Sequence, residues 1–288
     1  LVGGTQTNLT VIVASLRPHQ GVIAAESGHI NVHETGAIEA TGHKVIGLPS
    51  TDGKLTAKQV RDYAQAQQAD ENAEHVVQAK MVYISNSTEL GTTYGLSELE
   101  ALSAVCREFG LYLYMDGARL GYALESCDND LTMSDIARLC DVFYVGGTKQ
   151  GAMFGEAVVI CNPAISQDFR YIIKQRGGML AKGWLLGLQF EVLFEDDLYF
   201  QLSRHANRMA DRLRAALSDA GFRLLLPGTT NQVFAVLPDN LLAQLSESFT
   251  FMLHEKMDDG YTAVRFCTSW ATSPESIDKL VAAIRRYS

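Results

Sequence analysis

Basic residues are scarce in this sequence of 288 residues. It has 24 lysines and arginines against 33 aspartates and glutamates, which gives a net charge of -9 at pH 7. Binding to nucleic acid draws on clustered basic side chains, so we expect no nucleic-acid partner. No apolar run is long enough to cross a bilayer, so we expect no membrane association.

Cysteine is also scarce, and no two cysteines form a Cys-x-x-Cys pair. The five are Cys106, Cys127, Cys140, Cys161 and Cys267. They predict reduced thiols in the core of a cytoplasmic protein. The sequence begins at Leu1 without a methionine and soon enters a glycine-rich turn, so we expect that an N-terminal segment, with any targeting signal, is missing from it.

Apolar strands and amphipathic helices alternate from Gly4 to Cys161. This alternation predicts a large α/β domain with a mainly parallel sheet flanked by helices. We expect strands at 21–25, 44–48, 80–85, 111–116, 141–146 and 156–161, and helices at 9–16, 56–69, 97–109 and 134–139. Ser97 and Glu100 predict a capping box for the third of these helices.

The remainder of the chain predicts a second, smaller domain. Residues 183–217 form a helical pattern with a charged break at 195–197, and we interpret them as a bridge. Beyond it we expect strands near 222–226, 232–237, 249–255 and 262–268, and helices at 239–247 and 273–287. The predicted domains are therefore 1–205, including the bridging helix, and 206–288, a C-terminal α+β unit.

Lys149 is the first candidate for chemistry. It follows the strand Val142-Phe143-Tyr144-Val145 and lies among glycines, which let the backbone approach a ligand closely. Parallel sheets bind ligands at the carboxyl ends of their strands. A lysine at that edge can form a Schiff base, although a solvated lysine after a buried strand is the common alternative.

Asp116 ends the preceding apolar strand and is the second candidate. An interior parallel strand is continuously apolar, so Asp116 is expected at the same sheet edge as Lys149. The alternative is that Asp116 caps the next helix.

The stretch from Gly3 to Asn8 precedes an apolar helix and is the third candidate. Free backbone N–H groups, the helix dipole and the hydroxyls of Thr5 and Thr7 together form an anion site suited to phosphate. The sequence matches neither the P-loop nor Gly-x-Gly-x-x-Gly, which argues against a nicotinamide-dependent dehydrogenase, and an ordinary N-cap explains the pattern about as well.

His29 and His33 follow another strand, four residues apart. This spacing occurs in zinc sites, but no third ligand stands at a recognisable distance, so we expect no metal. A histidine here can instead stack on a ring, or can be a core histidine with its hydrogen bonds satisfied.

A phosphate site, a stacking histidine, an aspartate and a lysine together are what pyridoxal 5'-phosphate (PLP) requires. The lysine binds the cofactor, the aspartate keeps the pyridine nitrogen protonated, and the helix N-terminus holds the phosphate. A non-catalytic protein that keeps this fold is the alternative, although its site would be expected to lose the lysine or the aspartate.

Three motifs carry a resemblance to a known family: Gly28-His29-Ile30, Asp116-Gly117-Ala118-Arg119-Leu120 and Gly147-Thr148-Lys149-Gln150-Gly151. They resemble the low-specificity L-threonine aldolase and β-eliminating lyase family of fold type I PLP enzymes, over nearly the whole chain. The resemblance implies a PLP-binding lyase that splits the Cα–Cβ bond of L-threonine or L-allo-threonine into glycine and acetaldehyde. Another reaction on the same cofactor, β-elimination or transamination, is the alternative.

The resemblance also implies roles for single residues. His29 would stack on the cofactor, Asp116 would contact its pyridine nitrogen, and Lys149 would carry it, with Thr148 alongside. Gly4 and Thr5 would hold the phosphate. Arg119 and Arg265 would bind the substrate carboxylate.

A physical argument also supports carboxylate binding by Arg265, because an arginine in an apolar strand needs a charged partner. The alternative is an edge-strand salt bridge. Where many members of the family have a histidine, a candidate base for the β-hydroxyl, this chain has Thr88. The resemblance further implies a homodimer or homotetramer.

Overall fold

The computed structural model describes residues 1–257 and 260–287. Its first part is a six-stranded sheet in the order β2-β1-β3-β4-β5-β6. The strands are β1 (Gln20–Ala25), β2 (Val45–Leu48), β3 (Gln78–Ser85), β4 (Tyr112–Asp116), β5 (Val142–Gly146) and β6 (Glu156–Ile160). All neighbours are parallel except β5 and β6. The predicted strands and the mainly parallel sheet are therefore confirmed.

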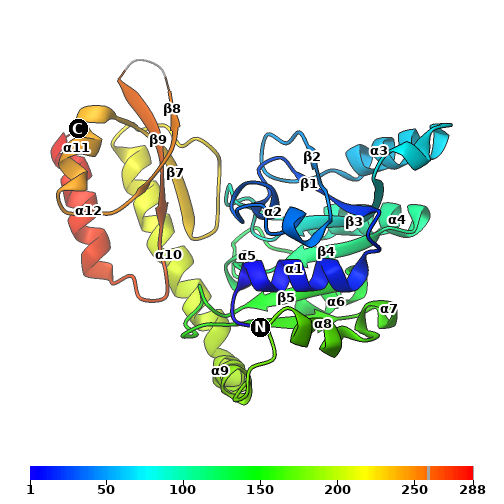
Figure 1. Ribbon diagram of the computed structural model, residues 1–288. Coiled ribbons are helices and arrows are strands. Elements are labelled where there is room, and N and C mark those ends of the chain that lie inside the picture. The colour runs from blue at the N-terminus through cyan, green and yellow to red at the C-terminus, as the bar shows by residue number, and fades with distance from the viewer. Residues whose placement is uncertain (258–259, 288) are drawn as a thin grey trace.

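Helices cover both faces of this sheet (Figure 1). On one face lie α1 (Gly4–Ser15), α7 (Pro163–Ser166) and α8 (Phe169–Gln175), and on the other α3 (Ala57–Ala69), α4 (Leu96–Phe109) and α6 (Met133–Leu139). Both faces of the central strands are thus buried, which is why these strands are apolar at consecutive positions. Short elements complete this part: α2 (His29–Val32), α5 (Leu120–Leu124), Glu39–Thr41 and Ala73–His75.

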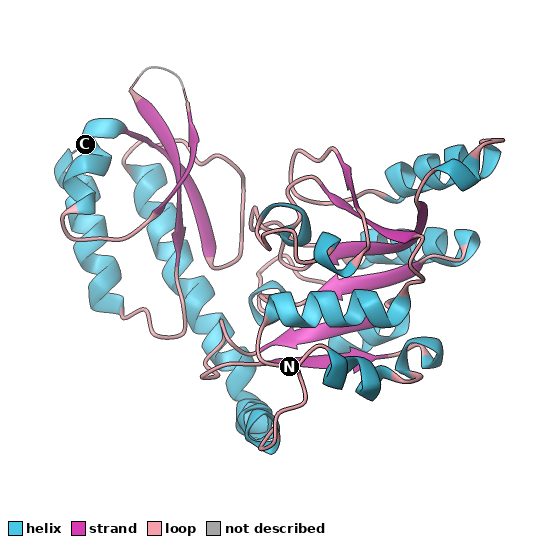
Figure 2. Ribbon diagram, viewed as in Figure 1, coloured by secondary structure: helices cyan, strands magenta, loops and turns pink. Residues whose placement is uncertain are grey.

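The second part is smaller and has an antiparallel sheet in the order β7-β9-β8 (Figures 1 and 2). It comprises β7 (Gln232–Pro238), β8 (Met252–Lys256), β9 (Tyr261–Cys267), α11 (Asp239–Ser246) and α12 (Pro274–Tyr287). The bridge consists of α9 (Trp184–Phe194), a turn at Glu195–Asp197 and α10 (Leu198–Asp219). Tyr199 of α10 belongs to the core of the large sheet, whereas Leu213 and Leu217 belong to that of the small one. The predicted boundary at residue 205 falls inside α10 and remains a prediction.

Several local predictions were wrong. The first helix begins at Gly4, not near Leu9, and the residues before it form no strand. The capping box is not at Ser97, because the N-cap is Gly95, whose N–H donates to Glu98 Oε2 at 2.9 Å. The strand expected at 222–226 is reduced to one bridge between Leu224 and Ala235.

The cysteine prediction was only partly right. Cys106 and Cys140 are buried free thiols, but Cys127, Cys161 and Cys267 are exposed. Within residues 1–257 and 260–287 no helix has the length and apolar character that crossing a membrane requires.

Gly121 packs where α5 meets α10, and we predict that Gly121→Ala destabilises the protein. A Cβ there would overlap the Gln150 amide and the Ser203 hydroxyl, both buried, and would lie 2.8 Å from Tyr199 Cε1. Such overpacking costs about 1–3 kcal/mol of the free energy of unfolding. Urea unfolding measures this loss of free energy. The control Gly228→Ala, whose added Cβ would lie no closer than 3.8 Å to another atom, should stay within about 0.5 kcal/mol of the unmutated protein. Equal losses in the two variants would contradict the prediction.

Candidate active site

A pocket of about 300 Å³ opens at the carboxyl ends of β4 and β5. It is lined by seven of the predicted site residues: Gly4, Thr5, His29, Asp116, Arg119, Thr148 and Lys149. The parallel pairing of β4 with β5 places Asp116 and the turn that contains Lys149 at one edge of the sheet. The predicted convergence of these residues is therefore found, while their chemical roles remain predictions.

Lys149 lies half-buried in the turn after β5. Burial lowers the pKa of its amine, and the positive charge of Arg119 lowers it further, while Asp116, Glu156 and Glu89 act in the opposite direction. A lowered pKa increases the fraction of neutral amine, the nucleophilic form. Lys149 is therefore better suited to covalent chemistry than an exposed lysine.

Asp116 is 4% exposed and accepts hydrogen bonds from four donors. Tyr83 Oη and Asn8 Nδ2 donate to Oδ2 at 2.6 and 3.1 Å, and Tyr144 Oη and the Ala118 N–H donate to Oδ1 at 2.5 and 2.9 Å. Burial and the nearby Asp116 charge raise the pKa of both tyrosines well above the usual value, so both phenols stay protonated as donors. The carboxylate is thus held in one orientation, and the helix that follows is capped at Arg119 instead.

His29 begins α2 and is connected to Asp116 through side chains that the sequence did not point to. Its Nδ1 lies 2.8 Å from Glu34 Oε1, which also accepts from Asn8 Nδ2 at 2.6 Å. Asn8 in turn donates to Asp116. The hydrogen bond with Glu34 is the main cause that raises the pKa of His29. The sequence did not single out Asn8, because α1 contains several other polar residues, among them Gln6 and Thr10.

The N-terminus of α1 also lines the pocket, through Gly3, Gly4 and Thr5. No side chain caps its first turn, so these N–H groups are not satisfied by a cap. Thr7 was wrongly predicted to contribute its hydroxyl, because that hydroxyl donates to Gly3 O at 3.0 Å and the residue is buried. Thr5 is exposed and remains a candidate.

Two buried polar atoms beside this turn have no hydrogen-bond partner among the described residues. They are Nε of Arg119 and Oγ of Ser87, and both residues line the pocket. Buried polar groups are nearly always paired, so an unpaired donor at a pocket wall indicates a missing acceptor. An anionic ligand would supply acceptors for both.

Thr148 and Glu156 also line the pocket. Thr148 Oγ1 accepts from the Gly155 N–H at 3.0 Å, and Glu156 Oε2 accepts from the Gly147 N–H at 3.1 Å. Burial raises the pKa of Glu156 to about 7. The sequence analysis did not single out this acid, which stands at the first position of β6 and not at the carboxyl end of a parallel strand.

Arg265 and Thr88 do not line this pocket. Arg265 lies on β9, the central strand of its sheet, so it is not on an edge strand, and no described carboxylate forms an ion pair with it. Its Nη1 donates to Gln232 Oε1 at 3.3 Å, and Gln232 Nε2 donates to Thr88 O at 3.0 Å. Burial, followed by the charges of His29 and Arg265, lowers the pKa of His33, the residue that follows α2. Arg265 therefore lies outside the lining of the pocket.

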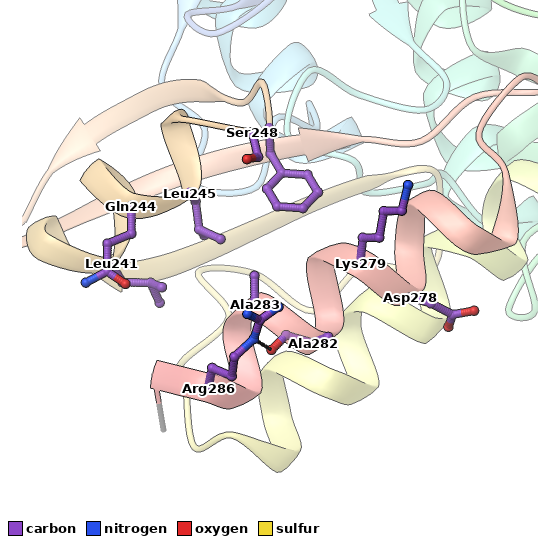
Figure 3. Close-up of a pocket in the computed structure, with 10 residues that line it drawn as sticks. Leu241, Gln244, Leu245, Ser248, Asp278, Lys279, Ala282, Ala283 and Arg286 are labelled. Atoms are coloured by element: carbon purple, nitrogen blue, oxygen red, sulfur yellow. Dashed lines mark hydrogen bonds between the residues drawn. The ribbon is translucent and has the colours of Figure 1, made fainter.

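Another hollow lies on the outer side of the small sheet, between α11 and α12 (Figure 3). Leu241, Leu245 and Phe249 form its apolar side, and Lys279 and Arg286 of α12 border it. None of the predicted site residues is there, so it is not the candidate active site.

Comparison with known proteins shows the family of the chain. A sequence model of the beta-eliminating lyase family matches residues 1–240. The chain belongs to this family. It is 32% identical to the low specificity L-threonine aldolase of Pseudomonas aeruginosa, over 98% of the chain and 80% of that protein. The predicted membership is thus confirmed, and with it the expectation of a lyase.

Solved structures agree with this family assignment. A threonine aldolase from Leishmania major is 51% identical with a TM-score of 0.95, over 99% of the chain and 82% of that structure. An aspartate aminotransferase from Thermus thermophilus, at 18% identity and a TM-score of 0.68, covers 100% of the chain and 75% of that structure and shares its fold. The predicted fold class, fold type I with a large α/β domain, is confirmed.

The raised pKa of Glu156 predicts a pH-dependent stability of the protein without ligand. The folded state holds this proton up to about pH 7, whereas the unfolded chain releases it near 4.5. The stabilising contribution is therefore complete below pH 4.5 and is lost as the pH rises to 7. The glutamine of the variant Glu156→Gln keeps an acceptor for Gly147 and cannot titrate, so the free energy of unfolding of the wild type relative to the variant should fall by roughly 3 kcal/mol or less across this window. A constant difference in urea unfolding from pH 4.5 to 8 would contradict the prediction.

Proposed function

We propose that this chain is a PLP-dependent aldolase that cleaves the Cα–Cβ bond of β-hydroxy-α-amino acids. Threonine and allo-threonine would give glycine and acetaldehyde. The observation that carries the proposal is one pocket in which the Lys149 amine, with its lowered pKa, meets the buried Asp116 carboxylate and His29. The relatives named threonine aldolase support the substrate class.

The residues present fit the cofactor. The uncapped first turn of α1 and the unpaired Arg119 Nε and Ser87 Oγ provide donors for a phosphate or a carboxylate. Lys149 would hold the aldehyde carbon, and Asp116 would accept from the pyridine nitrogen, beside the donors that already orient it. When bound, PLP supplies a ring that withdraws the electron pair released at Cα.

The substrate carboxylate would bind Arg119, which lines the pocket. Arg265 is the second proposed ligand of this carboxylate, although it does not line the pocket. Gln232 joins it to the backbone of the loop after β3, which contributes Ser87 to the pocket wall. The alternative reaction, β-elimination, fits the name of the family and would use the same lysine and aspartate; substrate profiling separates it from aldol cleavage.

One prediction concerns Lys149. Lys149→Ala should lose turnover of L-threonine and L-allo-threonine by at least ~10³-fold while keeping its fold, because the amine that binds the cofactor is gone. Glycine release, the visible absorption band and its loss on borohydride treatment measure this in both proteins. The control Lys80→Ala replaces a lysine outside the pocket whose amine caps the Gly110 carbonyl, and it should retain activity. Cleavage at a near-normal rate in Lys149→Ala would exclude the proposed role.

We further propose that the protein is a homodimer or homotetramer. The support is α9, which exposes five large apolar side chains: Trp184, Leu185, Leu188, Val192 and Phe194 are 42–65% exposed. Apolar side chains exposed together on one helix indicate an interaction surface. Gln189 of the same helix accepts from the N–H of Met153, close to the Lys149 turn, so a second copy on α9 would border the pocket.

The five free thiols fit a reducing compartment such as the cytoplasm.

Another prediction concerns this helix. Leu188→Glu, which places a charge in the middle of the apolar surface, should convert the assembly into smaller species because an unpaired charge is costly to bury. Light scattering after size-exclusion chromatography measures the mass. Gln68→Glu, an exposed change on α3, is the control and should leave the mass unchanged. A wild-type protein that is monomeric at micromolar concentration would contradict the proposed assembly.

A further inference from the structure

Thr88 occupies the position at which a base for the β-hydroxyl was expected, but it is directed away from the pocket. Its side chain is fully buried, and its hydroxyl lies 2.7 Å from Thr92 Oγ1 and accepts from the Thr92 N–H at 3.2 Å. A Cβ on Gly53 would lie 2.9 Å from the same hydroxyl, so no open space adjoins it. Thr88 therefore fixes the loop and cannot reach a ligand.

The next residue in the loop, Glu89, lines the pocket together with His29, Asp116 and Lys149. Its Oε1 accepts from Ser85 Oγ at 2.8 Å and from the His29 N–H at 3.0 Å. These two bonds hold the carboxylate at the wall of the pocket beside His29. In the described part of this loop, residues 86–92, Glu89 is the one ionisable side chain that lines the pocket.

The charges around Glu89 favour proton uptake. Burial, followed by the charge of Asp116, raises its pKa, while the Ser85 hydroxyl and His29 act in the opposite direction. Lys149 faces it from the turn after β5 and is itself affected by its charge. A carboxylate with a raised pKa is a stronger base near neutral pH than an exposed glutamate.

We propose that Glu89 is the base that removes the β-hydroxyl proton of the substrate. This inference rests on the proposed aldolase function. The Glu89 carboxylate takes the hydroxyl proton, the O–H electron pair becomes the second bond of the aldehyde C=O, and the Cα–Cβ bond breaks. Its electron pair remains on the Cα side, where PLP, when bound, would supply the electron-withdrawing ring. Cα then takes up one proton, so substrate and products balance without an oxidant or reductant.

Glu89→Gln tests the proposal. The glutamine amide oxygen can still accept from Ser85 and His29, so the loop should keep its shape while the basic group is lost. Cleavage of L-threonine should fall by roughly 10²–10⁴-fold, the usual contribution of a general base. Glu89→Asp, which keeps a carboxylate, should recover part of the loss.

Three further readouts separate this role from a structural one. The exchange of the glycine α-proton in D₂O requires the cofactor and Lys149 but no β-hydroxyl, so it should remain within about 3-fold of the wild type in Glu89→Gln. The unfolding midpoint and the cofactor affinity should be retained. In the protein without cofactor, infrared titration should reveal a carboxyl band that Glu89→Gln lacks and that titrates above the range of an exposed glutamate.

Thr88→Val is the matched control in the same loop. It removes a hydroxyl at nearly constant volume and is expected to lower the unfolding midpoint while keeping cleavage within about 3-fold. Large loss of cleavage in Thr88→Val with none in Glu89→Gln would overturn the proposal.

The remaining outcomes are equally decisive. Near-normal cleavage in Glu89→Gln, joint loss of cleavage and glycine exchange with cofactor still bound, or a Glu89 band in the ordinary range would each overturn the role of Glu89 and leave the aldolase function standing. A wild-type protein that binds no PLP and releases no glycine would overturn the aldolase function, and this inference with it.

Discussion

The burial of one carboxylate, that of Asp116, is the constraint on which the rest of the site depends. A charge with only 4% exposure is tolerated only if hydrogen bonds replace its hydration. Its side-chain donors come from three elements, since Asn8 lies on α1, Tyr83 on β3 and Tyr144 on β5. These bonds fix α1 against the sheet, and the N-terminus of that helix is consequently aimed at the pocket. The orientation of the proposed phosphate site thus follows from the need to solvate an aspartate.

The hydrogen bonds around Asp116 continue to His29, which lines the pocket. Asn8 contacts both Asp116 and Glu34, and Glu34 contacts His29, so the two ends of the pocket share one chain of hydrogen bonds. Tyr114 Oη donates to Asn8 Oδ1 at 2.7 Å and fixes which side of this amide faces the acids. A change in the charge at either end is therefore felt at the other through groups that are largely withdrawn from water.

The fold could be predicted from the sequence wherever burial leaves a continuous pattern. The residues before Asp116 and those before Lys149 are apolar at successive positions because both faces of their strands are covered. That pattern predicts that Asp116 and Lys149 lie at the same edge of the sheet. The start of α1 could not be predicted, because Gly3 and Gly4 are typical of turns and the helix nevertheless begins there. Glu89, Glu34 and Asn8 were missed for a common reason: each becomes functional through partners distant in the sequence, and no local spacing encodes such a partner. Arg265 shows another limit, because the strand around it was predicted, but the side chain is only half-buried and contacts Gln232 instead of lining the pocket.

The sequence separation of the donors to Asp116 has a consequence for how the protein is made. Asn8 and Tyr144 are bonded to the same carboxylate although they stand at opposite ends of the segment that builds the large sheet. As the chain leaves the ribosome, Asn8 of α1 must remain without Tyr114 and Asp116 until β4 has emerged, and Asp116 lacks its donor Tyr144 until β5 has emerged. Parallel pairing of distant strands is also slow to form. During synthesis, the early apolar segments are thus exposed for the time needed to add most of this domain, which makes this interval the one in which assistance by chaperones would matter most.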